Sequence, residues 1–328
     1  MSVSPVSERV LATPGLTVTV VSRHLAATDV VWLELAPAGD RELPSWTAGA
    51  HIEIALPDTD GSCHLVRHYS LIGLPSGREN WQIAVLREAN GRGGSAAMHD
   101  LQLGDVLEVR AVRNNFPLKD ATEYLFIAGG IGITPLIGLA QEADRKGLAW
   151  NLIHLVRSAD RLIDVTSLLP RDSRSHVADI HGRADLEVLT ASLRGGSVYA
   201  CGPAPLLSDL EKLAHDAPWD LAVERFAADP KQSADVQSTD RPFDVILQRS
   251  GKRLHVPAHR SILDVVRDAG VSVDFSCQEG ICSSCEIPVL AGDLDHRDHV
   301  LDEAERAAND CMMICVSRCV GNELTLDL

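Results

Sequence analysis

The sequence lacks the long apolar runs and the leader that would place a protein in a membrane or outside the cell. It contains no run of about 18 apolar residues, so we expect no membrane-spanning helix. Its first residues, MSVSPVSERVLATPG, hold no basic segment followed by an apolar one, so we expect no export signal. It also lacks internal repeats and low-complexity segments. These absences predict a cytoplasmic protein made of ordinary globular domains.

Positive charge is scarce as well. Lysine and arginine total 30 against 46 aspartates and glutamates, which gives a net charge of −16. Such a surface repels the phosphates of nucleic acids, so we expect no nucleic-acid partner. The charge favours solubility and suits a basic protein partner. A length of 328 residues with 45% hydrophobic content predicts two or three domains, each with a core.

Four of the eight cysteines have a spacing that predicts a metal centre. Four residues separate Cys277 from Cys282, two separate Cys282 from Cys285, and the 29 residues 286–314 separate Cys285 from Cys315. This is the plant-type ferredoxin pattern, in which four thiolates hold a 2Fe–2S cluster. The irons need soft ligands in tetrahedral geometry, and a short loop with three cysteines supplies most of them.

Two other interpretations of these cysteines stay open at this point. Zinc sites usually have paired C-x2-C knuckles, whereas this loop has one C-x2-C with a C-x4-C before it. Structural cysteines without a ligand are the second alternative. Disulfides are a poor interpretation of a long chain without an export signal. We interpret Cys63, Cys311 and Cys319 as small buried apolar residues.

The order of the periodic segments predicts three domains. Residues 1–118 contain six short runs of branched and aromatic residues, which predicts an antiparallel β-barrel with one short helix at SAAMHDL. Residues 119–228 alternate strands with helices, which predicts an α/β domain with a parallel sheet. Residues 229–240 have the composition of a linker. Residues 241–328 contain a β-hairpin, a helix capped by Ser261, the cysteine loop and a closing strand, which predicts an α+β domain.

Two motifs in the first domain offer the groups that a flavin nucleotide needs. Arg67, His68, Tyr69 and Ser70 lie on a predicted strand and supply a cation, an aromatic ring and a hydroxyl. The run NGRGGS, residues 90–95, opens a short helix, and its glycines let backbone N–H groups approach an anion. Taken alone, the first motif is also explained by an ordinary strand and the second by an ordinary hairpin loop.

The second domain has two motifs at the carboxyl ends of predicted strands. The run GGIGITP, residues 129–135, follows a strand and precedes a helix, which is the context of a dinucleotide pyrophosphate site. Its spacing is not G-x-G-x-x-G. Cys201, Gly202 and Pro203 end a later strand at the same edge of the sheet, where open parallel sheets bind ligands. Packing alone would also explain Cys201.

In this order, RHYSL, GRGGS, GGIGITPL, YACGP and the cysteine loop resemble the phthalate dioxygenase reductase family, which includes vanillate demethylase reductase subunits. The resemblance covers roughly residues 14–328. It implies a flavin-binding β-barrel, an NAD-binding α/β domain and a C-terminal ferredoxin domain of the β-grasp type. Members are electron-transfer oxidoreductases that pass electrons from NADH through FMN and a 2Fe–2S cluster to a terminal Rieske-type oxygenase. We therefore expect that oxygenase as the protein partner, no membrane partner, and a monomeric reductase.

The resemblance also implies roles for single residues, none of them a general acid or base. Ser70 would lie nearest N5 of the flavin, Thr134 near the nicotinamide and Cys201 where hydride leaves, while Phe226 would cover the flavin until nicotinamide displaces it. The family pattern places the fourth cluster ligand before Val-Ser-Arg, which selects Cys315 over Cys311 and Cys319. The complete implied sets are Arg67, His68, Tyr69 and Ser70 for the flavin; Arg92, Gly93, Gly94 and Ser95 for the FMN phosphate; Gly130, Gly132, Thr134, Cys201, Gly202, Pro203 and Phe226 around the nicotinamide nucleotide; and Cys277, Cys282, Cys285 and Cys315 for the cluster.

The resemblance leaves alternatives for cofactors and partner. FMN is expected over FAD because the ferredoxin domain comes last and GRGGS is present. The segment after Arg157 and Ser158 is divergent, and a basic side chain there would bind the 2′-phosphate of NADPH. NADPH therefore remains an alternative to NADH as the electron donor. The alternative functions are a reductase for a cytochrome P450, a stand-alone flavin reductase, and a carrier without enzymatic activity.

Two features of the last domain depart from the pattern or extend it. Ser283 stands where relatives usually have glycine, and a serine beside Cys282 would alter hydrogen bonding to sulfur and the potential of the cluster. The segment 293–310 holds seven carboxylates against two arginines. It is either a solvated helix face or a docking surface for a basic partner.

Overall fold

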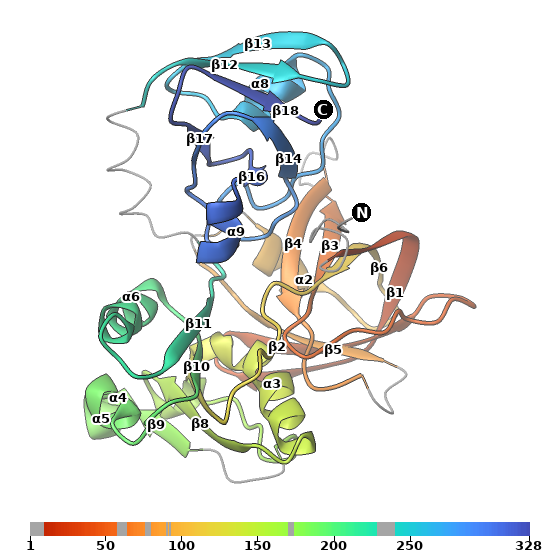
Figure 1. Cartoon of the computed structure of the whole chain (residues 1–328). Coiled ribbons are helices and arrows are strands. Elements are labelled where there is room, and N and C mark those ends of the chain that lie inside the picture. The colour runs from red at the N-terminus through yellow and green to blue at the C-terminus, as the bar shows by residue number, and fades with distance from the viewer. Residues whose placement is uncertain are drawn as a thin grey trace. The chain divides into compact units, whose positions relative to one another are not determined.

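The computed structural model describes residues 10–57, 64–75, 80–89, 91, 93–169, 174–227 and 240–328. Two units divide the chain, Met1–Glu224 and Arg225–Leu328 (Figure 1). Apart from Asp240, the predicted linker lies outside the described residues. None of the helices in the described part of the chain combines the length and the apolar character that a membrane crossing needs.

The first sheet of the Met1–Glu224 unit is antiparallel, with strand order β4-β3-β6-β1-β2-β5. Ile72, just past β4, donates its N–H to the Gln82 carbonyl on β5 at 2.9 Å, which joins the two outer strands. Branched side chains such as Val31, Leu33 and Leu35 alternate along β2 into the core of this sheet, so the predicted β-barrel is confirmed. Its elements are β1 (Val10–Ala27), β2 (Val30–Pro37), β3 (His51–Pro57), β4 (His64–Ser70), β5 (Trp81–Leu86), α2 (Gly94–Asp100) and β6 (Val106–Arg113).

The second sheet of this unit is parallel, with order β11-β10-β7-β8-β9. Side chains of β7 alternate between two cores: Phe126 packs in the cluster of α3, and Ile127 in that of α6. The predicted α/β domain is confirmed, although β9, β11, α4 and α5 were not predicted. Its elements are β7 (Glu123–Gly129), η1 (Gly130–Gly132), α3 (Ile133–Arg145), β8 (Ala149–Val156), η2 (Ala159–Arg161), β9 (Arg174–Val177), α4 (Ala178–His181), α5 (Leu186–Thr190), β10 (Ser197–Cys201), α6 (Ala204–Ala214) and β11 (Asp220–Glu224).

The barrel and the parallel sheet share one core within their unit. Ile72 and Phe116 from the barrel segment belong to the same buried cluster as Leu136 and Ile137 of α3. A Cβ on Gly138 of α3 would lie 2.5 Å from the carbonyl oxygen of Gly73, so helix and barrel are in close contact there. This shared core fixes the barrel motif and the glycine-rich turn relative to each other.

The Arg225–Leu328 unit has a mixed sheet of order β13-β12-β18-β14-β16, in which β12 and β18 are parallel neighbours. The Ser261 hydroxyl accepts a hydrogen bond from Asp264 N at 3.0 Å, so the predicted N-cap of α8 is confirmed. The hairpin, the helix across it and the central closing strand confirm the predicted β-grasp fold. Its elements are β12 (Phe243–Leu247), β13 (Lys252–Val256), α8 (Ile262–Asp268), β14 (Glu286–Ala291), β15 (Leu294–Asp295), α9 (Glu303–Ala308), β16 (Cys311–Met313), β17 (Arg318–Cys319) and β18 (Glu323–Leu326).

Candidate functional site

The barrel brings its two predicted motifs into contact. Arg67 and Tyr69 lie on one face of β4, and His68 and Ser70 on the other, because side chains alternate along a strand. A Cβ on Gly94 would lie 2.5 Å from Nε of Arg67, so a side chain at this position would displace Arg67 from its place beside the start of α2. The cation and the glycine-rich turn therefore form one cradle, as an FMN phosphate requires.

The end of β4 holds a polar atom that needs a partner. Ser70 is buried, and its Oγ has no hydrogen-bond partner among the described residues. Tyr69 is partly buried against the barrel core, and burial raises the pKa of its hydroxyl above the ordinary value. A buried hydroxyl without a partner is costly unless a ligand bonds to it. Together with the cradle at Gly94, this atom shows that the barrel fits a flavin nucleotide.

The other residues predicted to bind the flavin nucleotide differ in their surroundings. Ser95 accepts a hydrogen bond from Glu88 N at 3.0 Å, so its hydroxyl oxygen faces the preceding turn. Gly93 has a φ of +83°, a conformation that favours glycine. Arg92, predicted to bind the FMN phosphate, lies outside the described residues.

His68 faces a buried polar cluster that was not predicted. Its ring centroid lies 5.1 Å from that of His51, the residue opposite Ser70 on β3. On the same face, Arg113 Nε and Glu53 Oε1 form a buried ion pair at 2.5 Å. Removing either partner of such a pair would leave an uncompensated buried charge. No local motif marks Glu53 or Arg113, since they are 60 residues apart.

The two motifs of the parallel sheet pack directly against each other. Cys201 at the end of β10 is in register with Ala128 at the end of β7. A Cβ on Gly132 would lie 2.2 Å from the Cys201 carbonyl oxygen, and one on Gly129 would lie 2.6 Å from Cδ of Pro203. The glycines therefore allow two backbone turns to meet at the carboxyl edge of the sheet. The turn η1 and the start of α3 lie at this edge, which is where parallel sheets bind the pyrophosphate of a dinucleotide.

Glu224 is a candidate site residue that the sequence interpretation missed. It follows Val223 on β11 and is in register with Cys201 on β10. Its Oε2 is buried without a partner among the described residues, and burial raises the pKa of its carboxyl group to about 8. Burial, with a smaller contribution from Glu224, also raises the pKa of Cys201. Burial therefore favours the neutral thiol of Cys201 and the protonated carboxyl group of Glu224.

The remaining predicted residues of this site have different surroundings. Thr134 is buried, and its hydroxyl donates to the Ile131 carbonyl at 3.1 Å. Gly202 packs against Gly129, with 2.9 Å from its ideal Cβ position to Gly129 Cα. Phe226, in the other unit, is 44% exposed, so its ring is available to a ligand or a partner surface.

The Arg225–Leu328 unit buries the four predicted cluster cysteines. Cys277, Cys282, Cys285 and Cys315 are each at most 8% exposed and form no disulfide. The Cys277 thiol lies close enough to those of Cys282 and Cys315 for them to lower its pKa, and Cys315 also lies close to Cys285. The fold thus gathers three thiols of one loop and a fourth from beyond β16. Soft, buried, mutually adjacent thiols are the donor set that a 2Fe–2S cluster needs.

The neighbouring cysteines have other surroundings. Cys311 lies on β16, where burial, Glu286 and Asp310 raise the pKa of its thiol to about 12. Cys319 is only partly buried, and its thiol donates to the Glu323 carbonyl at 3.5 Å. Of the three cysteines in CMMICVSRC, Cys315 is the one whose pKa is shifted by the loop thiols of Cys277 and Cys285. Among the described residues, no group of three or more His, Cys, Asp or Glu side chains is placed to hold a single metal ion.

The cysteine loop takes its shape from unusual backbone conformations. Gln278 and Ser283 have φ values of +59° and +57°, which side chains other than glycine rarely adopt. Ser283 is buried, and its hydroxyl donates to the Cys282 carbonyl at 2.7 Å. Ser284 contacts the Cys282 sulfur directly, with 3.3 Å between Oγ and Sγ. Ser284 therefore contacts the ligand sulfur, and the Ser283 hydroxyl contacts the ligand backbone.

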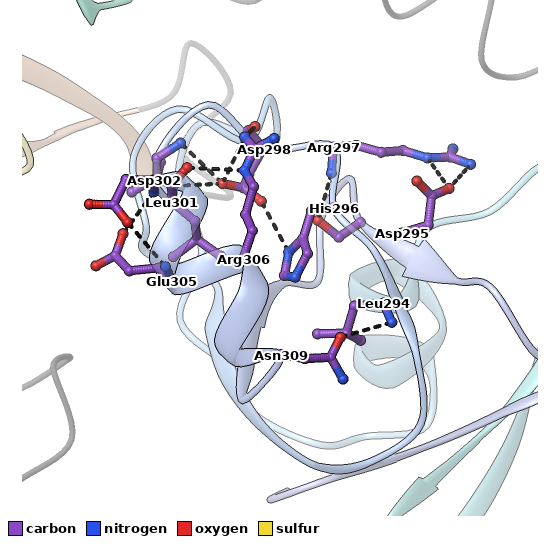
Figure 2. A network of polar contacts seen from close by, with 12 residues as sticks. Leu294, Asp295, His296, Arg297, Asp298, Leu301, Asp302, Glu305, Arg306 and Asn309 are labelled. Carbon is purple, nitrogen blue, oxygen red and sulfur yellow. Dashed lines mark hydrogen bonds and ion pairs between the residues drawn. The ribbon is translucent and has the colours of Figure 1, made fainter. Parts of the chain in front are cut away.

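Much of the carboxylate-rich segment 293–310 is engaged in internal contacts (Figure 2). Asp298 is buried, and its Oδ2 accepts from Val300 N at 3.1 Å and from Leu301 N at 2.8 Å. Asp302 and Glu305 form a capping box at the start of α9. Asp295 pairs with Arg297 at 2.6 Å. These carboxylates hold the segment together, so the segment is not a uniform acidic surface.

Comparisons with known proteins agree with this geometry. Residues 245–320 match the family of 2Fe–2S iron–sulfur cluster binding domains. The chain is 41% identical over 320 residues to a putative toluene-4-sulfonate monooxygenase system reductase subunit of Comamonas testosteroni, covering 95% of this chain and 98% of that protein.

Two solved structures are also similar over nearly the whole chain. One belongs to an intact type IV self-sufficient cytochrome P450 monooxygenase, with 39% identity and a TM-score of 0.87, and covers 95% of this chain but 41% of that one. The other is phthalate dioxygenase reductase, described as a modular structure for electron transfer from pyridine nucleotides to 2Fe–2S, with 34% identity and a TM-score of 0.64. The match covers 96% of this chain and 98% of that reductase. The resemblance first seen in the motifs is confirmed, and the chain belongs to the phthalate dioxygenase reductase family.

Proposed function

We propose that this chain is the NADH-oxidising reductase of a Rieske-type oxygenase system that hydroxylates aromatic rings or removes O- or N-methyl groups. It is an oxidoreductase that moves electrons from a pyridine nucleotide to a 2Fe–2S cluster, and FMN is the proposed carrier between them. The observation that carries this proposal is that four buried thiols follow, in one chain, a barrel and a parallel sheet that fit a flavin and a dinucleotide.

The proposed domains follow the three main sheets. Residues 1–118 would bind FMN, residues 119–228 would bind NADH, residues 229–240 would link the units, and residues 241–328 would hold the cluster. The match of residues 245–320 to cluster-binding domains supports the last boundary. The shared core of the first two supports a common role for the barrel and the parallel sheet in one hydride-transfer site.

In the barrel, we assign positioning roles to the chain's own groups. Arg67, Gly93, Gly94 and Ser95 would hold the phosphate of FMN, with Arg92 as a further donor. Tyr69 would pack on the flavin ring, His68 would line its site, and the buried Ser70 hydroxyl would bond its reactive edge. When bound, a flavin takes up two electrons as hydride and releases them singly, which a nicotinamide cannot do.

At the edge of the parallel sheet, Gly130, Gly132 and Thr134 would shape the dinucleotide site. Gly202 and Pro203 close its other side. Cys201 and Glu224, which are in register on neighbouring strands, would lie beside the nicotinamide, and burial favours the uncharged form of both. We assign Phe226 to the flavin face, which its exposed ring supports. Cys277, Cys282, Cys285 and Cys315 would ligate the cluster.

A cytochrome P450 is the second candidate partner. A self-sufficient P450 monooxygenase contains a region that is 39% identical to this chain with a TM-score of 0.87, so a region of this type also occurs together with a haem-containing monooxygenase. Either partner receives single electrons from the cluster, so the reductase chemistry is the same. We further propose that the protein works in the cytoplasm, where its thiols stay reduced until the cluster is inserted.

Cofactor analysis tests the proposal. Protein produced with adequate iron and sulfide should contain two irons, two sulfides and one FMN per chain. It should reduce cytochrome c with NADH much faster than with NADPH. Protein that lacks iron and sulfide under these conditions would refute the cluster assignment. Flavin that proves to be FAD would refute the FMN assignment alone.

A further inference from the structure

A buried histidine, His154, bonds to the glycine-rich turn that begins at Gly129. His154 lies on β8 in register with Ala128 of β7 and is 2% exposed. Its Nε2 lies 2.9 Å from the carbonyl oxygen of Gly130. A carbonyl can only accept, so Nε2 carries the proton and donates it. Burial lowers the pKa of His154, which keeps the imidazole neutral.

The second ring nitrogen of His154, Nδ1, indicates that the histidine is present for its bond to the turn. Nδ1 of His154 is buried and has no hydrogen-bond partner among the described residues. An unpaired buried nitrogen is a cost that an apolar residue would avoid. The bond to Gly130 is therefore the polar contact that accounts for a histidine at this position.

The second carbonyl of the turn is held in the same way. The Thr134 hydroxyl donates to the Ile131 carbonyl at 3.1 Å, and Ile133 N donates to both Gly130 O and Ile131 O. Both carbonyl oxygens are thus bound within the protein. Carbonyl oxygens that faced a pyrophosphate would repel it, whereas backbone N–H groups attract it.

Gly130 makes this support necessary. Its φ is +55°, and an added Cβ would meet nothing within 4 Å, so its conformation is held through its carbonyl oxygen, by Ile133 N and by His154 Nε2. Glycine moves readily between regions of φ and ψ. A rotation of the Gly130–Ile131 peptide would turn the Gly130 carbonyl toward the ligand and the Ile131 N–H away from it.

We propose that His154 is a positioning residue for the dinucleotide: its bond to Gly130 O fixes the peptide orientation in which the turn accepts the pyrophosphate. The proposal rests on the assignment of this edge to NADH in the proposed function. His154 acts through the backbone and has no contact with the reacting atoms. Its loss therefore weakens binding of ligands with a pyrophosphate and leaves the hydride-transfer chemistry unchanged.

The test compares variants that keep or lose the donor. His154→Gln retains a terminal N–H donor, His154→Asn is too short to reach Gly130 O, and His154→Leu has no donor. Calorimetric titration of the holoprotein with ADP-ribose should show a dissociation constant raised about tenfold for Asn and Leu, and little changed for Gln. KM for NADH should rise alongside, with kcat at saturating NADH largely kept.

A phosphate-free hydride donor separates positioning from general damage. The rate of flavin reduction by 1-benzyl-1,4-dihydronicotinamide should be the same in wild type and in His154→Asn. His99→Leu is the matched control, since buried His99 also contacts a backbone carbonyl at 2.9 Å, that of Val85 in the barrel. It should lower the melting temperature but leave the affinity for ADP-ribose unchanged.

Three results would overturn the proposal. They are unchanged ADP-ribose affinity in both His154→Asn and His154→Leu, equal loss of the reaction with the phosphate-free donor, or the same loss in His154→Gln as in His154→Asn. If His154→Leu does not fold, the Asn and Gln pair still decides between these outcomes. Wild-type protein that bound no ADP-ribose would instead contradict the NADH site of the proposed function.

Discussion

The two units of this molecule build their cofactor sites from different materials. In Arg225–Leu328, the proposed ligands are four side-chain thiols, three of them in one nine-residue loop from 277 to 285. In Met1–Glu224, the proposed dinucleotide site consists mainly of backbone groups at two turns that pack against each other. Replacing one ligand sulfur is enough to destroy a site made of side chains. A site made of backbone groups depends instead on the residues that hold the backbone in its conformation.

This difference predicts unequal consequences of substitution. In the thiol site, the identity of one residue decides whether the cofactor is held. In the backbone site, the decisive residues are those that pack against the turns or bond to their carbonyls. Substitutions at the two sites therefore test different parts of the account.

The largest effect is expected at the fourth thiol. Cys315→Ser should lose the cluster and reduce the rate of cytochrome c reduction to background, while NADH still reduces the flavin, because we assign hydride transfer to the other unit. Iron analysis and stopped-flow absorbance measure the two effects. Cys319→Ser is the control and should keep the cluster, since the Cys319 thiol bonds to a backbone carbonyl. Loss of iron in Cys319→Ser alone would show that the ligand assignment is wrong.

The backbone site should respond most at the contact between its two turns. Gly132→Ala would place a Cβ 2.2 Å from the Cys201 carbonyl, and we expect a loss of about 3 kcal/mol in the free energy of unfolding. NADH affinity should fall with it, as measured by titration. Gly147→Ala, at the end of α3, has φ +71° and open space, so it should cost about 1 kcal/mol and leave NADH affinity unchanged. Equal effects on affinity would refute the close packing of the turns.

Glu224 predicts a pH dependence of stability in the Met1–Glu224 unit. Its pKa is raised from 4.5 to about 8 by burial, so the folded state keeps a proton that the unfolded chain releases. The free energy of unfolding should therefore fall as pH rises from 4.5 to 8, by at most about 1.4 kcal/mol per pH unit.

Glu224→Gln tests this dependence. The substitution should flatten the pH dependence and raise the free energy of unfolding by about 2 kcal/mol at pH 8. Urea unfolding at several pH values measures both effects. Glu187→Gln, at an exposed carboxylate on α5, should leave the slope as it is. An unchanged slope in Glu224→Gln would contradict the assignment.

The smallest effect is expected in the cysteine loop, where Ser283 combines a strained backbone with a useful hydroxyl. Ser283→Ala keeps the left-handed φ of +57° and loses the bond to the Cys282 carbonyl, whereas Ser283→Gly also removes the strain. We expect the glycine variant to be more stable than the alanine variant by about 1 kcal/mol. The midpoint potential of the cluster should be similar in both, since the Ser283 hydroxyl bonds to the Cys282 carbonyl, whereas the Ser284 hydroxyl contacts the ligand sulfur. A large shift of the potential in Ser283→Ala would contradict this division of roles.

The same contrast explains how much the sequence could predict. The spacing of Cys277, Cys282 and Cys285 defines a loop site because the ligands are side chains close together in the chain. The run GGIGITP could be placed after a strand and before a helix, so its position at the sheet edge was predictable as well.

The residues that support these motifs could not be predicted. His154, 24 residues from Gly130, and Glu224, 23 residues after Cys201, meet their partners only through the pairing of parallel strands. Alone, each is one more polar residue on a short strand. Asp298 likewise belongs to an acidic run in the sequence, and only its bonds to Val300 N and Leu301 N show that it is buried structure.

The central claim is that electrons from a nicotinamide nucleotide reach the 2Fe–2S cluster of this chain. An anaerobic titration of the holoprotein with NADH, followed by electron paramagnetic resonance, tests it most directly. The account predicts the signal of a reduced 2Fe–2S cluster, rising to one spin per chain in wild type and absent in Cys315→Ser. A cluster that is present by iron and sulfide analysis but stays oxidised with excess NADH, while dithionite reduces it, would contradict the account.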